Sequence, residues 1–174
     1  TLRDWRDEDW EPFWEGTNTA NVMRWLGGVQ DEAGRHAAQE RLLSYKRDHG
    51  HTFWAVERRS DGAILGFCGL KRSNYDGGPM GLMEVGWRLR EDVWGQGYAR
   101  ESAAASLNLA FGRFDAEEVV AFTVAANEPS WGLMLRLGME RREDLDFANS
   151  TFDPDSGWII AYSIAAEEWA LINA

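Results

Sequence analysis

The stretch VWGQGYARESAAASLNLAF, residues 93–111, constrains the fold of this chain more than any other. Gly95 and Gly97 stand at the start of an alanine-rich run that continues to Phe111 and predicts a helix. Glycines let a backbone pass close to a ligand, because no Cβ blocks the approach. The first N–H groups of a helix lack internal partners and carry partial positive charge. The stretch is therefore either an ordinary strand-to-helix turn or an anion site suited to a pyrophosphate.

Two common phosphate-binding motifs do not fit the sequence around this glycine pair. A P-loop is excluded, since no Gly-Lys followed by Ser or Thr comes after the glycines. A dinucleotide-binding fingerprint is not favoured either, because the pair follows the fourth predicted strand and does not open a βαβ unit. The order of the surrounding elements has to decide between the remaining interpretations.

Hydrophobic periodicity predicts the element order β-α-α-β-β-β-α-β-α-β-β. The predicted helices are 7–16, a segment capped by Asp31 and ended by Gly50, 97–111, and 127–138 with Gly138 as its C-cap. The predicted strands are TLRDWRD (1–7), TFWAVERR (52–59), AILGFCGL (63–70), GLMEVGWRLR (81–90), EEVVAFTVA (117–125), MERREDLDF (139–147) and GWIIAYSIA (157–165). We expect one α/β domain over residues 1–174, with a mixed sheet and helices on its faces.

Composition and charge narrow the class of partner. A formal net charge of −11 argues against a nucleic-acid surface; it is compatible with a cationic partner such as an amine, or with solubility alone. No run approaches the ~20 apolar residues of a membrane span. The single cysteine, Cys68, lies in the apolar run ILGFCGL and is expected to be a buried, inert thiol in a cytoplasmic protein. His36, His49 and His51 do not group with Cys or Asp at metal-ligand spacing, so we expect no metal.

The series MEVGWRL, WGQGYA, a long helix, a strand and a helix running from NEPS to LRLGM resembles the GNAT family of acyl-CoA-dependent N-acetyltransferases. The resemblance covers nearly the whole chain and is greatest to the branch that acetylates the N-termini of ribosomal proteins. The pyrophosphate loop of the family reads [QR]-x-x-G-x-[GA]. Gly97 and Ala99 match its last two positions, and Trp94 replaces the first Gln or Arg.

The resemblance implies that the fourth and fifth strands splay apart and that coenzyme A lies in the V between them. Backbone groups of Trp87, Arg88 and Leu89 would pair with the pantetheine arm. Asn127 would reach the same arm or cap the next helix, and the two roles are compatible. The pyrophosphate would be held by the loop formed by Trp94, Gly95, Gln96, Gly97, Tyr98, Ala99 and Arg100.

Attack of an amine on a thioester benefits from a general base and from a group that protonates the leaving thiolate. Glu84, on the strand MEVGW, is the candidate base; the alternatives are an exposed strand carboxylate or a structural ion pair. Many family members carry a tyrosine four residues before the glycine of the LG turn, where this chain has Met134, which cannot donate a proton. Ser130 is the candidate acid, unless its hydroxyl is bonded to helix backbone. Tyr162 is a weaker candidate, expected to pack within the sheet.

We expect the acceptor pocket opposite the cofactor, between the first helices and the last two strands. Trp14, Trp25 and Trp158 contribute either pocket walls or core. Asp144, Asp146, Asp153 and Asp155 either attract a cationic acceptor or form a solvated acidic loop. The predicted activity is direct transfer of an acetyl group from acetyl-CoA to a primary amine, a peptide N-terminus or a small amine, by a monomer or homodimer. The alternatives are an acyl-CoA sensor with little catalysis and a structural domain that binds no CoA.

Overall fold

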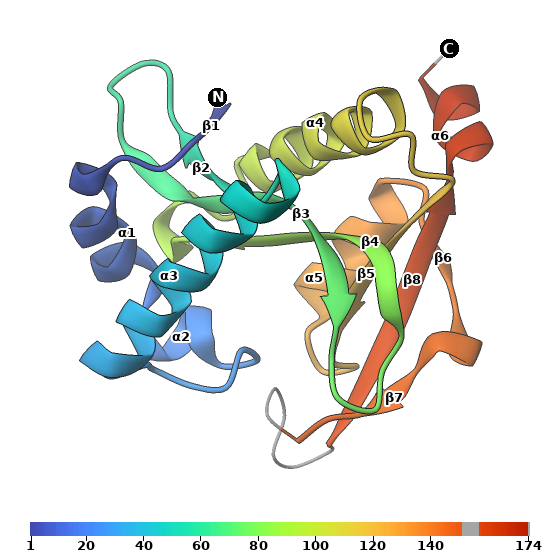
Figure 1. The fold of residues 1–174 in the computed structure, drawn as a ribbon, viewed down its shortest axis with the longest axis horizontal. Coiled ribbons are helices and arrows are strands. Elements are labelled where there is room, and N and C mark those ends of the chain that lie inside the picture. Colours follow the sequence, from blue (N-terminus) through green and yellow to red (C-terminus); the bar gives the residue numbers. More distant parts are fainter. Residues whose placement is uncertain (151–156, 174) are drawn as a thin grey trace.

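The computed structural model describes residues 1–150 and 157–173, which form an open mixed sheet covered by helices (Figure 1). The predicted α/β class is confirmed. The helices are α1 (Trp10–Thr17), α2 (Ala20–Met23), α3 (Glu32–His49), α4 (Tyr98–Gly112), α5 (Glu128–Arg136) and α6 (Ala166–Ile172). The strands are β1 (Leu2–Arg3), β2 (Phe53–Glu57), β3 (Ile64–Asn74), β4 (Met80–Leu89), β5 (Glu118–Thr123), β6 (Glu140–Arg141), β7 (Phe147–Ala148) and β8 (Trp158–Ala165).

The sheet has the strand order β1-β2-β3-β4-β5-β8-β6, with β7 also paired to β8. Only β4 and β5 run parallel; every other neighbouring pair is antiparallel. That parallel contact contains two residue pairs, Met83 with Val119 and Glu84 with Val120. Beyond Glu84, β4 stays paired with β3 as far as Leu89, while β5 stays paired with β8 as far as Thr123. The two central strands therefore splay apart after Glu84, as the family resemblance implied.

Alternation of side chains along the strands separates two hydrophobic layers. On one face, Leu65, Cys68 and Val85 pack with the apolar side of α4, including Leu107. On the other face, Ala55 and Phe67 pack with α1 and α3 around Phe13, which is fully buried. The helices on the two faces hold β3 and β4 as a rigid platform on which the splayed end of β4 is displayed.

Several elements differ from the sequence prediction. The first strand keeps only two residues, because a single 3-10 turn begins at Asp7 and leads into α1. The segment 139–147 is broken into β6, a 3-10 turn at Glu143–Leu145 and β7. Helices α2 and α6 were not predicted. Helix α6 is fixed at its start by Glu168, whose carboxylate accepts a hydrogen bond from the Ala165 N–H at 2.9 Å, and by the Trp169 indole, which donates to Asn108 at 2.8 Å.

The close approach of β2 and β3 yields a prediction about stability. A Cβ added at Gly69 would lie 2.2 Å from the backbone oxygen of Thr52, which cannot move without breaking the sheet. We expect Gly69→Ala to lower the free energy of unfolding by about 2–3 kcal/mol in urea denaturation. Gly112→Ala, at the end of α4 where a Cβ meets nothing within 4 Å, should instead raise it by roughly 0.5–1 kcal/mol. Equal effects of the two substitutions would contradict this account.

Candidate functional site

A cleft of about 1250 Å³ opens where β4 and β5 diverge. It is lined by residues from both arms of the V, by the glycine loop and by the helices over the β4 face. The cleft brings together all the predicted site residues except Gln96: Glu84, Trp87, Arg88, Leu89, Trp94, Gly95, Gly97, Tyr98, Ala99, Arg100, Asn127 and Ser130. The predicted residues thus share one cavity, although they come from three separate segments of the chain.

The glycine loop has the geometry of an open backbone cradle. Gly95 and Gly97 have φ of 72° and 87°, a region that glycine enters without the steric penalty of other residues. A Cβ added at either position would meet nothing within 4 Å, so the space above the backbone is empty. Gly97 is the N-cap of α4, and no side chain caps this helix start. The first N–H groups of α4 are therefore left to bind an anion.

The Trp94 side chain anchors this loop to the end of β4. Its indole nitrogen donates to the backbone oxygen of Leu89 at 2.8 Å, while about half of the side chain stays exposed. Gln96 turns away and donates to the backbone oxygen of Asp92 at 2.9 Å. The tryptophan that departs from the family pattern therefore has a definite structural role.

The backbone of β4 presents alternate residues to the gap. The Arg90 N–H donates to Leu65 on β3, and a Cβ added at Gly66 on β3 would lie 2.1 Å from the Arg88 oxygen. Backbone groups of successive strand residues point to opposite edges. Trp87 and Leu89 therefore face the gap with their backbone groups, whereas those of Arg88 face β3. This corrects the expectation that the Arg88 backbone pairs with a ligand; only its side chain lines the cleft.

Glu84 is the last residue of β4 that pairs with β5, and its carboxylate is buried. Its Oε1 accepts a hydrogen bond from the Tyr75 hydroxyl at 2.7 Å. Its Oε2 has no hydrogen-bond partner, with the Lys71 ammonium at 3.5 Å. The expectation of an exposed strand carboxylate is thereby excluded, and an ion pair with Lys71 is present.

Burial raises the pKa of the Glu84 carboxyl, and Lys71 and Tyr75 offset that rise only in part. Burial and the neighbouring Glu84 also raise the pKa of Tyr75, which keeps its hydroxyl protonated as a donor. A carboxylate with a raised pKa and one oxygen without a hydrogen bond is suited to accept a proton.

The other arm of the V carries Asn127 and Ser130. The Asn127 side chain does not cap α5; its amide donates to the Thr123 hydroxyl at 3.1 Å. The Ser130 hydroxyl makes no hydrogen bond within the described part of the chain, so the alternative of a backbone-bonded hydroxyl does not hold. Met134 is buried in the core, and Tyr162 packs within the same cluster, as expected for a sheet residue.

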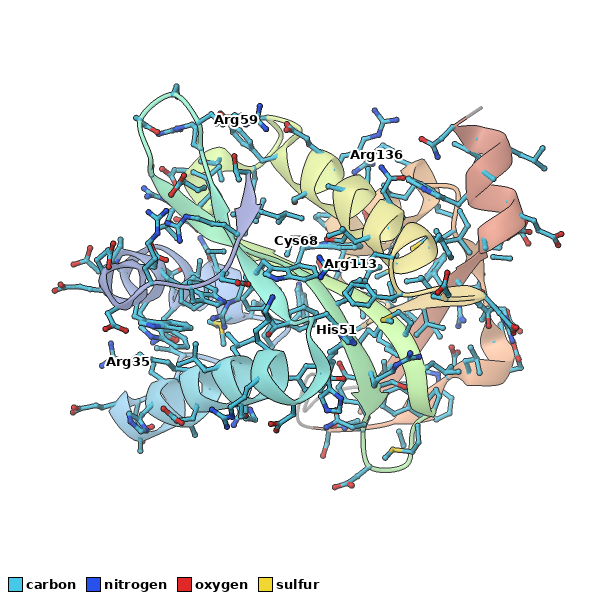
Figure 2. The ribbon with its side chains drawn as sticks, turned by 45° about the horizontal axis from the view of Figure 1, so that its top comes forward. Arg35, His51, Arg59, Cys68, Arg113 and Arg136 are labelled. Atoms are coloured by element: carbon cyan, nitrogen blue, oxygen red, sulfur yellow. The ribbon has the colours of Figure 1, made fainter. Side chains whose placement is uncertain are left out.

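Cys68 lies between the sheet and α4 (Figure 2), fully buried, with its sulfur 3.6 Å from the Ser106 hydroxyl. Burial raises the pKa of its thiol to about 11. A thiol in this state is a poor nucleophile. Among residues 1–150 and 157–173 there is no group of three or more His, Cys, Asp or Glu that could hold a metal ion, and no helix long and apolar enough to cross a membrane.

The wall across from the glycine loop comes from α2, α3, β7 and β8 and includes Met23, Tyr45, Phe147 and Ile159. Of the three tryptophans considered, only Trp25 lines the cleft; Trp14 is core, and Trp158 is about half exposed. Asp144 and Asp146 are paired with Arg142 and Arg141, so they do not form the free acidic attractor considered above. Asp153 and Asp155 lie outside the described residues.

Sequence reasoning missed Lys71 and Tyr75. Lys71 faces Glu84 directly across the β3–β4 ladder, and its ammonium lies 4.1 Å from the centre of the Tyr75 ring. The signal was present in the hairpin register. The prediction ended the third strand at Leu70, however, four residues before its true end at Asn74.

Comparison with known proteins agrees with this geometry. Residues 1–140 match the family model described as an acetyltransferase (GNAT) domain. The chain is 26% identical to the uncharacterized N-acetyltransferase YnaD of Bacillus subtilis, over 97% of this chain and 94% of that protein. An acetyltransferase from Agrobacterium tumefaciens superposes with a TM-score of 0.79 at 22% identity, covering 94% of this chain and 89% of that one. Spermidine N-acetyltransferase from Vibrio cholerae, solved with CoA and spermine, superposes with a TM-score of 0.73 at 17% identity, covering 98% of this chain and 97% of that one.

The buried carboxylate leads to a prediction about stability and pH. Because the native pKa of Glu84 lies above its value of about 4.5 in the unfolded chain, the wild type loses stability as the pH rises from there through the native value. Glu84→Gln cannot ionise and escapes this loss. We expect its melting temperature to rise relative to that of the wild type as the pH increases above about 4.5.

Glu118→Gln is the matched control, because this carboxylate lies on the neighbouring strand and is far more exposed, beside Arg142. It should show no such gain. If the melting temperature of Glu84→Gln instead fell relative to that of the wild type as the pH rises, the stabilisation from the ion pair with Lys71 would outweigh the cost of burying the charged carboxylate.

Proposed function

Because the chain belongs to the acetyltransferase (GNAT) family of acetyl-CoA-dependent acyltransferases, we propose that it transfers an acetyl group to a primary amine by direct attack within a ternary complex. The acceptor is a peptide N-terminus or a small amine. The single observation that carries the proposal is the divergence of β4 and β5 immediately after the buried Glu84. Glu84 would there serve as a proton acceptor at the apex of a gap whose edges offer backbone hydrogen-bonding groups.

The residues around the gap fit coenzyme A. The uncapped start of α4 and the empty space above Gly95 and Gly97 suit the pyrophosphate. The pantetheine arm would add to β4 as a further strand, pairing with Trp87 and with the N–H of Leu89. Asn127, on the facing arm, would contribute its side-chain oxygen. Fixing the thioester between two sheet edges lowers the entropic part of the barrier to attack.

In the reaction, the amine nitrogen forms a bond to the thioester carbonyl carbon, and the carbon–sulfur bond then breaks. Glu84 would take a proton from the acceptor ammonium, directly or through a water, so that the neutral amine can attack, with Tyr75 holding its other oxygen. A backbone N–H on the gap edge of β4 would donate a hydrogen bond to the oxyanion and stabilise it. The N–H of Trp87 is the candidate for this role. Ser130 would donate its hydroxyl proton to the CoA thiolate and regain a proton from solvent. The buried Cys68 offers no route through a covalent acyl-enzyme.

The relatives whose names state an acceptor differ in that acceptor, so resemblance does not identify the acceptor of this chain. One relative is FsC-acetyl coenzyme A-N(2)-transacetylase of Aspergillus fumigatus, 35% identical over 49% of this chain and 37% of that protein. The sensor alternative is not favoured by family membership, and the retained Glu84 and Ser130 also speak against it.

Release of the CoA thiol, measured over a panel of amines, tests the activity. We expect turnover with at least one primary amine. Glu84→Gln should lower kcat/KM on the order of 10²-fold at pH 8, and the deficit should shrink as the pH falls, because protonation then removes the base from the wild type as well. Tight acetyl-CoA binding without turnover on any amine would contradict the proposed enzyme activity. A loss of kcat/KM in Glu84→Gln that does not change with pH would exclude Glu84 as the base.

The cofactor loop is tested by Gly97→Ala, measured by calorimetric titration with CoA. A methyl group above the loop would fill the space assigned to the pyrophosphate, so CoA affinity should fall by about 10-fold or more. Gly62→Ala is the matched control, because Gly62 has a similar φ of 73° and equally open surroundings, but lies in the β2–β3 turn. Both variants should lose a similar ~1 kcal/mol to backbone strain. Equal CoA affinity in the two would mean that the pyrophosphate binds elsewhere.

A further inference from the structure

The charges that line the cleft are opposite in sign to the charge of the protein. The chain carries a net charge of −11, but among the described residues the cleft is lined by six basic side chains and one acidic side chain, Glu84. The basic residues are Arg24, Arg41, Lys71, Arg88, Arg100 and Arg136. Arg100 lies on the helix that follows the glycine loop and suits the CoA phosphates. The positive charge over the α2–α3 side of the cleft remains to be explained.

Arg88 is the most unusual of these residues, because it is a buried cation with no counter-ion among the residues that the structure describes. Only 8% of it is exposed, and Nε has no hydrogen-bond partner there. Its guanidinium lies 4.7 Å from the ring centre of Phe13, 5.0 Å from that of Phe67 and 5.2 Å from that of Trp14. One terminal nitrogen reaches only the Met23 thioether, at 3.1 Å.

Such an arrangement is unfavourable in the free protein. Aromatic faces and a thioether replace little of the hydration that a guanidinium loses on burial. Burial accordingly lowers the pKa of Arg88 to about 10. Other arginines of the chain, among them Arg3, Arg58 and Arg141, are paired with carboxylates. An anion entering the cleft would give Arg88 a counter-ion. The planar fork of N–H donors on the guanidinium matches the two oxygens of a carboxylate.

Arg88 and Glu84 share one face of β4, since they are four residues apart on a strand. Their Cα atoms are therefore about 13 Å apart. The same face is covered by α1 and α2, through Phe13 and Met23. A molecule whose amine reaches the Glu84 end would extend a second group along this face toward Arg88.

We propose that the acceptor is an amino carboxylate, with its amine near Glu84 and its carboxylate on the guanidinium of Arg88, separated by a spacer of several bonds. The inference rests on the proposed acetyl transfer and narrows its substrate class. Charge lining the cleft favours it over a polyamine, which the basic side chains would repel. Arg88 is then a specificity-determining residue that takes no part in the proton transfers.

The experiment compares matched amines with and without a carboxylate: 4-aminobutanoate, 6-aminohexanoate and L-lysine against their amides, with spermidine as a cationic amine. Thiol release by the wild type should give a kcat/KM at least about 10-fold higher for the acids than for the amides. Arg88→Met, which keeps an apolar side chain in the aromatic cage, should bring that ratio close to one without changing CoA affinity. Its melting temperature should equal or exceed that of the wild type, because a buried unpaired charge is removed.

Arg24→Met is the control for long-range electrostatics, since Arg24 also lines the cleft but is exposed and rests on Trp25. It should keep the preference for acids. A preference for amides or spermidine, an unchanged ratio in Arg88→Met, or an equal loss in Arg24→Met would overturn the proposal. So would a fall in CoA affinity in Arg88→Met with the ratio retained, since Arg88 would then bind a CoA phosphate.

Binding separates this proposal from the proposed activity. Calorimetry of 6-aminohexanoate with the CoA-saturated protein should show binding to the wild type and at least 10-fold weaker binding to Arg88→Met. If no amine is acetylated but this difference is found, the acetyl transfer fails and the carboxylate site stands. If amines are acetylated but the two proteins bind the probe equally, the carboxylate site fails and the transfer stands.

Discussion

The divergence of β4 from β5 is the constraint on which the rest of the structure depends. β3 holds β4 along its length, whereas β5 holds it through two residue pairs only. A strand that has lost one neighbour within a sheet exposes unpaired N–H and C=O groups. The gap edge of β4 is thus an unsatisfied ladder inside the protein, and a cosubstrate with amide groups is the natural partner for it. The glycine loop, the buried carboxylate and Ser130 all take their positions from the two arms of this gap.

The distribution of charge shows that overall composition is a poor guide to the chemistry of a cleft. Many carboxylates lie on the outside, where Asp61, Asp92 and Asp144 are paired with arginines. Inside the cleft the balance reverses, and the one buried carboxylate is matched by a buried guanidinium on the same strand face. A net charge of −11 is compatible with a cationic partner or with solubility alone; the charge that lines the cleft favours an anionic group on the amine.

Most of the element order was predictable because it follows from long periodic segments, whereas the splay of β4 from β5 was implied by the family resemblance. The family resemblance implied that Glu84, Asn127 and the glycine loop share one cleft, and they do. Asn127 and the loop stand at helix starts, whereas Glu84 lies within β4. The sequence prediction missed α6 and shortened β3, since the apolar periodicity of β3 stops at Leu70 while its pairing continues. Lys71 and Tyr75 were lost with that boundary. The Arg88 cage could not be predicted, because Phe13, Trp14, Met23 and Phe67 meet it only through tertiary packing.

The indole of Trp94 fixes the glycine loop at the position where the family pattern has Gln or Arg. Its hydrogen bond to the Leu89 oxygen ties the glycine loop to the strand before any ligand arrives. Glycines lose much conformational freedom on ordering, and a loop already tethered at one end loses less of it on binding. Gln and Arg, which stand here in the family pattern, share with Trp a side-chain N–H on a long stem. In this chain the Trp94 indole is the donor that ties the loop to the end of β4, so the loop is held open toward the cleft without the Gln or Arg of the family pattern.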